Sequence, residues 1–158
     1  MRGLTAACVL LGLQFSAEIS TGAAPTDACA LLAQQEVATA LGFSVDPGKH
    51  KISDADCRWT EPGKSIADGA ALQLYVTDAQ AFGIGKTPLS GWSKQPETGL
   101  GDEAYFVDSG KVYFLVSPTL SVKKGSVFFV IAARIPKASL EQIKAIEKAV
   151  AVKVLGKL

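Results

Sequence analysis

Apolar and polar residues alternate along the middle of the chain, and this period of two predicts β-strands. At 70–77, for example, three aliphatic side chains fall on one face and Tyr75 on the other. The strands predicted in this way are 55–60, 70–77, 104–107, 111–116, 120–122 and 126–135. Turns with a glycine at 108–110 and 123–125 are typical of hairpins, and Pro118 predicts an interruption of the ladder.

Helical spacing of apolar residues marks both ends of this region. The segment 26–41 predicts a helix in two pieces that ends at Gly42, a residue suited to a left-handed helix stop. The segment 137–155 predicts a second helix, and Ser139 and Gln142 have the spacing of a capping box near its start. Its lysines, including Lys144, are expected outside the buried stripe.

The order helix, strands, helix predicts an α+β domain: a single mostly antiparallel sheet with an N-terminal and a C-terminal helix packed on it. The strand 126–135 is apolar on both faces, so both faces of the sheet must be covered. Two helices can cover one face. The other face, with Tyr75, Tyr113 and Leu115, needs the segment 78–93, a bound apolar ligand or a partner subunit. We expect 78–93 to form a short helix and an irregular loop, and we favour cover by the chain itself.

The first residues have the features of a secretory signal peptide. Arg2 precedes an apolar run at 4–15, which is shorter than the roughly 20 residues that span a membrane. Small residues at 21–23 predict cleavage of 1–23, which leaves 24–158 as a single domain. We therefore expect an exported protein, periplasmic or secreted, with no transmembrane segment after cleavage.

The cysteines support this expectation. Cys8 has too little hydrophobic sequence before it for a lipid-attachment site, so lipid anchoring is not expected. Cleavage leaves Cys29 and Cys57, and an even pair in an oxidising compartment predicts a disulfide. Closing that loop stabilises the fold by about 3–4 kcal/mol on the chain-entropy model. The alternative is a two-cysteine metal site, which needs carboxylate ligands or His50, the only histidine. We favour the disulfide and expect no metal and no cofactor.

Charge and motifs argue against several functional classes. Without 1–23 the chain has 15 basic and 14 acidic side chains, a net charge of +1. This balance offers no footprint for nucleic acid and no basic patch for anionic lipid. The sequence at 85–87, GKT, resembles the end of a phosphate-binding loop. It lacks the first glycine of that motif, however, and Pro88 follows directly.

No residue is identified as catalytic. His50 lies between two lysines, whose charges disfavour its protonation, and we expect a solvated loop residue. A carboxylate pair, such as Asp102 with Asp56 or Glu61, is the remaining option, and spacing alone does not support it.

The stretch 99–106, GLGDEAYF, combines two glycines, two acids and an aromatic strand. Glycine permits tight backbone geometry and Asp102 can bond a local turn, so we interpret the stretch as a loop entering a strand. A binding site at Asp102 and Glu103 is the alternative. Trp92 lies in a loop rich in glycine and serine. Its side chain either packs over the sheet as a plug or is exposed as an anchor for a partner, and we favour the plug. Tyr75, Trp92, Asp102 and Tyr113 form our candidate surface for a ligand or partner.

Several of these motifs occur together in one protein family. They are Asp27-x-Cys29-x-Leu31-Leu32, Glu36-Val37, Ala40-Leu41-Gly42, Cys57-x-Trp59 and Gly99-Leu100-Gly101-Asp102-Glu103-Ala104. Together they resemble a family of small exported bacterial proteins, many of them actinobacterial lipoproteins, that share a domain of unknown function. The resemblance covers most of the mature chain and implies an extracytoplasmic α+β domain with the disulfide, and no catalytic residues. The chain departs from the family in lacking the lipid-attachment site. Ala33 also replaces a threonine at the second helix cap, which weakens that cap.

These observations favour a non-catalytic extracytoplasmic module, a monomer or weak dimer, that binds a small apolar ligand or a protein partner. The alternatives are a structural, envelope-associated protein without a ligand and a carboxylate-based hydrolase.

Overall fold

The computed structural model of the chain describes residues 27–84, 90–110 and 118–158. Its helices and strands follow in the order η1 (Ala28–Leu31), α1 (Gln34–Leu41), β1 (Asp56–Thr60), β2 (Ala71–Asp78), α2 (Gln80–Ile84), β3 (Ser93–Glu97), β4 (Glu103–Asp108), β5 (Thr119–Lys124), β6 (Val127–Arg134) and α3 (Leu140–Leu155). The strands form a six-stranded sheet in the order β1-β2-β6-β5-β4-β3, and every neighbouring pair is antiparallel. The α+β fold with a single antiparallel sheet is therefore confirmed.

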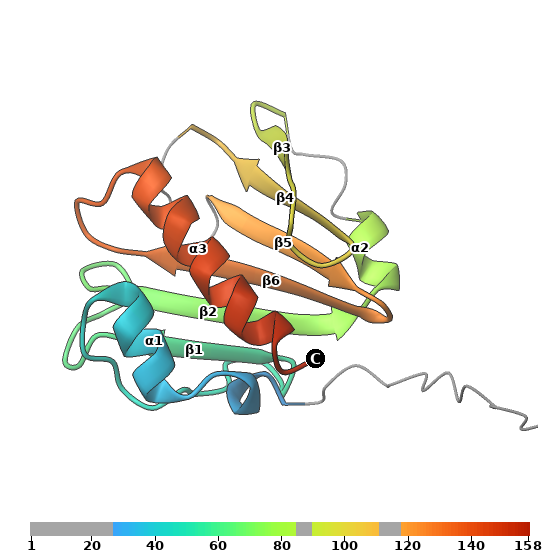
Figure 1. Cartoon of the computed structure of the whole chain (residues 1–158). Helices are drawn as coiled ribbons and strands as arrows, with labels where there is room; N and C mark the ends of the chain where they lie inside the picture. Colours follow the sequence, from blue (N-terminus) through green and yellow to red (C-terminus); the bar gives the residue numbers. More distant parts are fainter. Residues whose placement is uncertain (1–26, 85–89, 111–117) are drawn as a thin grey trace, which may run out of the picture.

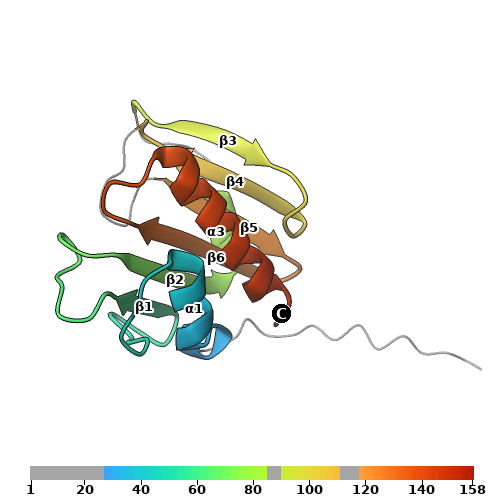
Figure 2. The same ribbon diagram turned by 60° about the vertical axis from the view of Figure 1, so that its left-hand side comes forward.

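The helices α1 and α3 lie on the same face of the sheet (Figures 1 and 2). The largest group of buried residues lies between these helices and the sheet. Cys57 and Trp59 of β1 belong to it, with exposed fractions of 0% and 1%. Alternation along β1 therefore places both side chains under the helices, where Trp59 is a core residue.

The N-terminal helix forms in the two predicted pieces. Asp27 caps η1, because its Oδ1 accepts hydrogen bonds from the backbone N–H groups of Cys29 (2.8 Å) and Ala30 (3.2 Å). Ala33 is the N-cap of α1 and has no side-chain acceptor to offer. Glu36 completes only half of a capping box, accepting from the Ala33 N–H at 2.8 Å. Gly42 ends the helix at a φ of 74°.

Two elements differ from the sequence prediction, and a third cannot be compared with it. The last helix begins at Leu140 rather than near 137, because Lys137 has a φ of 66° and Ser139 is the N-cap. The edge strand β3 was not predicted, since its sequence, SKQPE, has no buried face. The predicted strand 111–116 lies outside the described residues.

The disulfide between Cys29 and Cys57 is formed, with 5.0 Å between the two Cα atoms, and it ties η1 to β1. Gly48 packs against it. A Cβ atom built on Gly48 would lie 2.6 Å from the Cys57 Sγ and 2.7 Å from the Trp59 indole. The chain next to β1 therefore passes so close to the buried sulfur that only glycine fits.

In the described ranges, none of the helices combines the length and the apolar character that crossing a membrane requires.

Replacing Ala33 by serine should stabilise the fold, because a hydroxyl at the N-cap can accept the unpaired N–H groups at the start of α1. We expect the free energy of unfolding to rise by about 1 kcal/mol, measured by urea unfolding. Ala40→Ser, a substitution within the same helix, is the control. An equal effect of both substitutions would contradict this account of the cap.

Replacing Gly48 by alanine should destabilise the fold by about 1–3 kcal/mol, because the added methyl group overpacks the disulfide and Trp59. Urea unfolding measures the loss. Gly156→Ala is the matched control, since a Cβ there meets only ordinary contacts at 3.6 Å. A Gly48→Ala protein as stable as the parent would show that this packing is not tight.

Candidate functional site

The second face of the sheet is covered in part by the chain itself. Phe82 of α2 is 2% exposed and packs on Tyr105 and Phe128, with ring centroids 5.1 and 5.3 Å away. Lys94 lies above the Tyr105 ring, with its Nζ 3.9 Å from the centroid. The segment 78–93 thus supplies the expected short helix, and that helix covers aromatic residues of the second face.

The structure describes three of the four residues of the predicted ligand surface, and these three lie on different parts of the sheet. Tyr75 is 40% exposed on β2, on the second face. Trp92 is half-buried and immediately precedes β3. Asp102 immediately precedes β4, which is separated from β2 by β6 and β5 in the sheet. Tyr113 lies outside the described residues.

Asp102 has a local structural role. Its backbone N–H donates to the Lys123 carbonyl at 2.8 Å, and its Oδ2 accepts from the Gly125 N–H at 2.6 Å. This hydrogen bond and the nearby Lys124 lower the pKa of the Asp102 carboxyl. Gly101, at a φ of 59°, lies so close to Lys123 that a Cβ would collide with its carbonyl oxygen. GLGDEAYF is therefore the entry into β4, held against the β5–β6 hairpin.

The other predicted acids also serve the backbone. Asp56 Oδ1 accepts from the N–H groups of Lys51 (2.7 Å) and Ile52 (3.2 Å). Glu61 Oε2 accepts from the Ala70 N–H at 3.0 Å. The hydrogen bonds of Asp56 and Glu61 thus join each carboxylate to the backbone and do not pair it with a second carboxylate.

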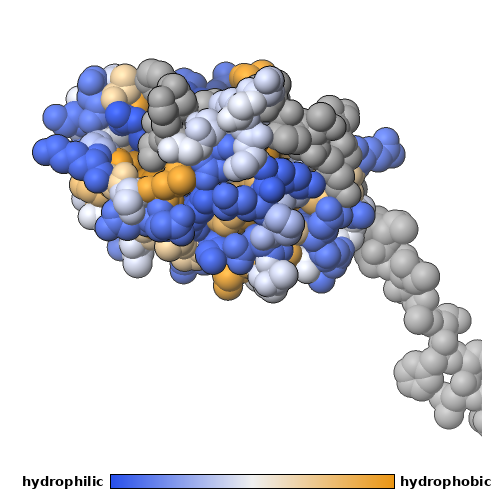
Figure 3. Space-filling view, turned by 90° about the horizontal axis from the view of Figure 1, so that it is seen from above, coloured by the Kyte–Doolittle hydropathy of each residue, from blue (hydrophilic) through white to orange (hydrophobic). Residues whose placement is uncertain are grey.

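A cleft of about 210 Å³ lies where the N-terminal half of α3 approaches β3 and β4. It is lined by Gln95, Pro96, Glu97, Phe106, Glu141, Lys144, Ala145 and Lys148. Figure 3 views the molecule from above Figure 1 and shows a mostly hydrophilic described surface, with hydrophobic residues in small separate patches. The cleft is thus a charged feature of a polar surface.

Lys144 is the most buried charge that lines the cleft. Its Nζ is 2.8 Å from Asp108 Oδ2 and donates to Gln95 Oε1 at 2.9 Å. The two charged side chains are only 10% and 3% exposed. Glu141 lies farther away, at 3.8 Å from the Nζ. The expectation that Lys144 lies outside the buried stripe is therefore wrong, because a partner carboxylate on β4 allows the lysine to turn inward.

Glu147 lies one helical turn farther along α3 and is completely buried. Its Oε1 accepts from the backbone N–H of Ala133 at 2.8 Å, and its Oε2 has no hydrogen-bond partner in the described part of the chain. The pairing of β5 with β6 ends at Leu120 and Ile131. Glu147 therefore supplies the acceptor for the Ala133 N–H, which lies beyond the end of the β5–β6 pairing, near the break predicted at Pro118.

Burial raises the pKa of Glu147 well above its ordinary value of 4.5, since removing the carboxylate from water penalises its charge. The hydrogen bond from Ala133 and the charge of Lys144 act in the opposite direction, and Asp108 adds to the rise. The side chain is consequently neutral over a pH range in which an exposed glutamate is ionised.

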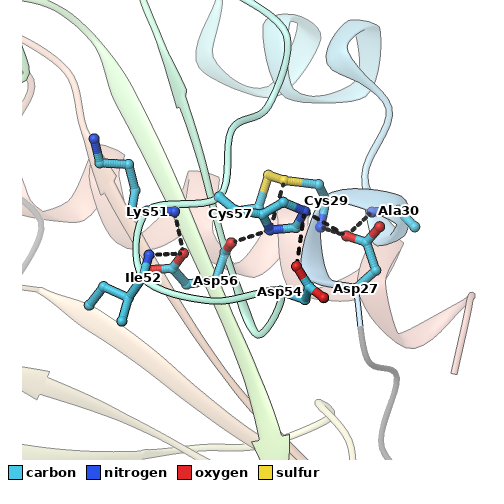
Figure 4. Close-up of a disulfide and its surroundings, with 9 residues drawn as sticks. Asp27, Cys29, Ala30, Lys51, Ile52, Asp54, Asp56 and Cys57 are labelled. Atoms are coloured by element: carbon cyan, nitrogen blue, oxygen red, sulfur yellow. Dashed lines mark hydrogen bonds and ion pairs between the residues drawn. A yellow bond between two sulfur atoms is a disulfide. The ribbon is translucent and has the colours of Figure 1, made fainter.

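A second polar cluster surrounds the disulfide (Figure 4). His50 Nδ1 is 2.9 Å from the backbone oxygen of Asp56, and its Nε2 is 3.4 Å from Asp27 and 3.9 Å from Asp54. The Asp56 carbonyl and the nearby carboxylates raise the pKa of His50. The expectation that the neighbouring lysines disfavour protonation of His50 is therefore wrong, because the fold places the Asp56 carbonyl and the carboxylates of Asp27 and Asp54 beside the ring.

Sequence reasoning missed the residues of the buried polar cluster at the cleft. Ile143, Glu147, Val150 and Val154 have the spacing of one helix face, and all are buried. A carboxyl group within an apolar stripe was the signal that could have identified Glu147. No comparable signal marks Asp108, since it lies at the end of a strand.

The comparisons with known proteins find no matching family model, no matching curated protein and no matching solved structure.

Replacing Glu147 by glutamine should make the free energy of unfolding less dependent on pH. Above pH 4.5 the unfolded parent releases a proton that the folded parent retains, so its stability falls as pH rises towards the folded pKa. The stability of Glu147→Gln relative to the parent should therefore increase by at least about 1 kcal/mol between pH 4.5 and 7.5. Urea unfolding across this range measures it.

Glu141→Gln is the control, because the Glu141 side chain is 85% exposed. If the stability difference between Glu147→Gln and the parent does not change with pH, Glu147 has an ordinary pKa in the folded protein.

Proposed function

We propose that this chain is an exported, non-catalytic binding module that recognises a protein partner through the cleft between α3 and β3. Export is supported by the apolar N-terminal segment and by the disulfide, since disulfides persist in oxidising compartments. The resemblance to small exported bacterial proteins points in the same direction.

The ion pair of Lys144 and Asp108 carries this proposal. Burying two charges costs several kcal/mol, and apolar residues of similar size often serve a core equally well. Both charges nevertheless lie almost fully buried, and Lys144 lines a cleft. The Lys144 ammonium has three N–H donors, of which Asp108 and Gln95 take two. The third can bond an acceptor that enters the cleft.

The chemistry of the cleft favours a protein partner over a small apolar ligand. Apolar molecules bind in enclosed pockets lined mainly by hydrophobic side chains. Here Lys148 and Glu97 form an ion pair at 3.4 Å at the cleft, and Lys144 and Glu141 add two further charges. Fixed charges of both signs suit the hydrogen-bonding groups of a peptide segment, and they select among partners by complementarity.

A carboxylate-based hydrolase is less well supported. Glu147 and Asp108 are two buried acids, and the pKa of one is raised, as such an enzyme requires. Glu147 is 0% exposed and does not line the cleft, while Asp108 is bonded to Lys144. A substrate in the cleft would not reach both carboxyl groups.

A photo-crosslinking amino acid at position 145 tests the proposal in the native envelope. Ala145 lines the cleft and is exposed, so the replacement should not disturb the core. We expect one defined protein to be crosslinked from position 145. Val152, which is on the same helix and 60% exposed, provides the control position and should not give that product.

Binding by the purified partner provides the decisive measurement. Ala145→Trp fills the cleft and should weaken binding by at least about tenfold, whereas Val152→Trp should change it less than about twofold. Isothermal titration calorimetry measures both affinities. Equal affinities of the two variants would overturn the proposal. A bound small molecule in the native mass spectrum, lost only in Ala145→Trp, would instead assign the cleft to a small ligand.

A further inference from the structure

Glu147 belongs to a buried polar cluster that reaches the cleft through Lys144. Glu147 and Lys144 are three residues apart on α3, a spacing that places two side chains next to each other on a helix. Both residues are buried, and so is Asp108 at the end of β4, whose carboxylate pairs with the Lys144 Nζ at 2.8 Å. The cluster therefore holds two carboxyl groups and one ammonium group, and of its three residues only Lys144 lines the cleft.

The charges that act on Glu147 come from two elements. Among the charged groups of the described residues, Lys144 of α3 favours an ionised Glu147, and Asp108 of β4 opposes it. The strand β6 contributes the Ala133 N–H, which donates to Oε1 at 2.8 Å. Glu141, a further acid near Lys144, is 3.8 Å from its Nζ and has an 85% exposed side chain. The ionisation of Glu147 is thus coupled to the charge of a residue that lines the cleft.

The second carboxyl oxygen of Glu147 is the unsatisfied atom of this cluster. Oε2 is buried and has no hydrogen-bond partner in the part of the chain that the structure describes. A neutral carboxyl group tolerates this position better than a carboxylate, because burying an unpaired charge costs far more than burying an unpaired dipole. Ionisation therefore requires a new donor for Oε2. Lys144 can supply it, since Asp108 and Gln95 take only two of its three N–H groups.

We propose that ionised Glu147 and the partner compete for the third N–H of Lys144, so that binding in the cleft is regulated by pH. This inference rests on the proposed function. While Glu147 carries its proton, the third N–H is available to an acceptor of the partner. When Glu147 releases that proton to the solvent, Oε2 accepts the N–H and the cleft loses its donor. Binding of the partner's acceptor then requires that Glu147 take up one proton.

The direction of the pH dependence follows from the burial of Glu147. Its pKa in the folded protein lies well above the ordinary value of 4.5, because burial penalises the charged form. Glu147 therefore keeps its proton in mildly acidic solution, where an exposed glutamate is already ionised. The affinity for the partner should be highest in that range and should fall as the pH rises through the folded pKa of Glu147.

NMR on the purified protein tests the exchange at Lys144 without a partner. The ¹³C signal of the Glu147 carboxyl group and the ¹⁵N signal of the Lys144 ammonium group are followed from about pH 5 to about pH 9, which covers the known pKa values of buried glutamates. We expect both signals to shift with one midpoint, and the Lys144 signal to stay constant over this range in Glu147→Gln. A Lys144 signal that does not respond when Glu147 ionises, or a Glu147 that does not titrate below about pH 9, would overturn the proposal.

Calorimetry with the crosslinked partner tests the effect on binding. The affinity of the parent should fall by at least about fivefold between about pH 5 and about pH 8. Glu147→Gln keeps the size of the side chain and an acceptor for the Ala133 N–H but cannot ionise, so most of this decrease should be lost. His50→Asn is the control, because it removes the only histidine, a residue type that titrates in the same range. His50 contacts β1, at the opposite edge of the sheet from β3, so this variant should retain the full decrease.

The two experiments separate this inference from the proposed function. If no partner is crosslinked from position 145, the proposed function fails, and the NMR titration alone decides whether Glu147 controls the ammonium group of Lys144. If a partner binds with the same pH dependence in the parent and in Glu147→Gln, the cleft remains the binding site, and its regulation by Glu147 is overturned.

Discussion

The two apolar faces of β6 constrain the rest of the structure. Phe129 and Ile131 point towards the helices and are completely buried, while Phe128 points to the opposite face and is 6% exposed. A strand of this kind cannot leave either face in water. One face is covered by α1 and α3, which pack side by side across it, and the aromatic part of the other is covered by α2. The positions of all three helices thus follow from the central strand.

The same packing explains why Lys144, Asp108 and Glu147 are buried together where α3 packs on the sheet. The pairing of β5 with β6 ends at Leu120 and Ile131. At the same end of the sheet, β4 ends at Asp108. Backbone and side-chain groups at this boundary need partners that the sheet does not provide. Residues of α3 supply these partners. Glu147 accepts the hydrogen bond of the Ala133 N–H, and Lys144 forms an ion pair with Asp108. The cleft lies beside this boundary, and Lys144, which lines it, is held by the buried carboxylate of Asp108.

Local sequence patterns were sufficient for most of the fold. Alternation along β1 is consistent with the burial of Cys57 and Trp59 on one face. Gly42 indicated the end of α1, and the spacing of Ser139 and Gln142 indicated the cap of α3, because capping is a local interaction. The edge strand β3 carries no such pattern, since an exposed strand needs no apolar face.

The site was less predictable, because its contacts join residues far apart in the sequence. The local sequence around Lys144 predicts a surface residue of an amphipathic helix. Its inward position depends on the carboxylate of Asp108 on β4, which is distant in the sequence. His50 has lysines beside it in sequence and carboxylates beside it in space. Charge patterns along a chain therefore do not establish the environment of a titratable group when its partners come from other elements.

The edges of the sheet restrict how a partner can be recognised. At β1 the backbone of Arg58 exchanges two hydrogen bonds of 3.0 Å with Lys49, so the chain before β1 already occupies this edge. At β3 the edge carries Pro96, which has no N–H, and Lys94, whose charge opposes addition of a strand. Both edges thus disfavour a partner that extends the sheet. A partner of the kind proposed above would then have to be recognised through side chains, such as those of Lys144 and Lys148, which line the cleft from a helix that packs on the sheet.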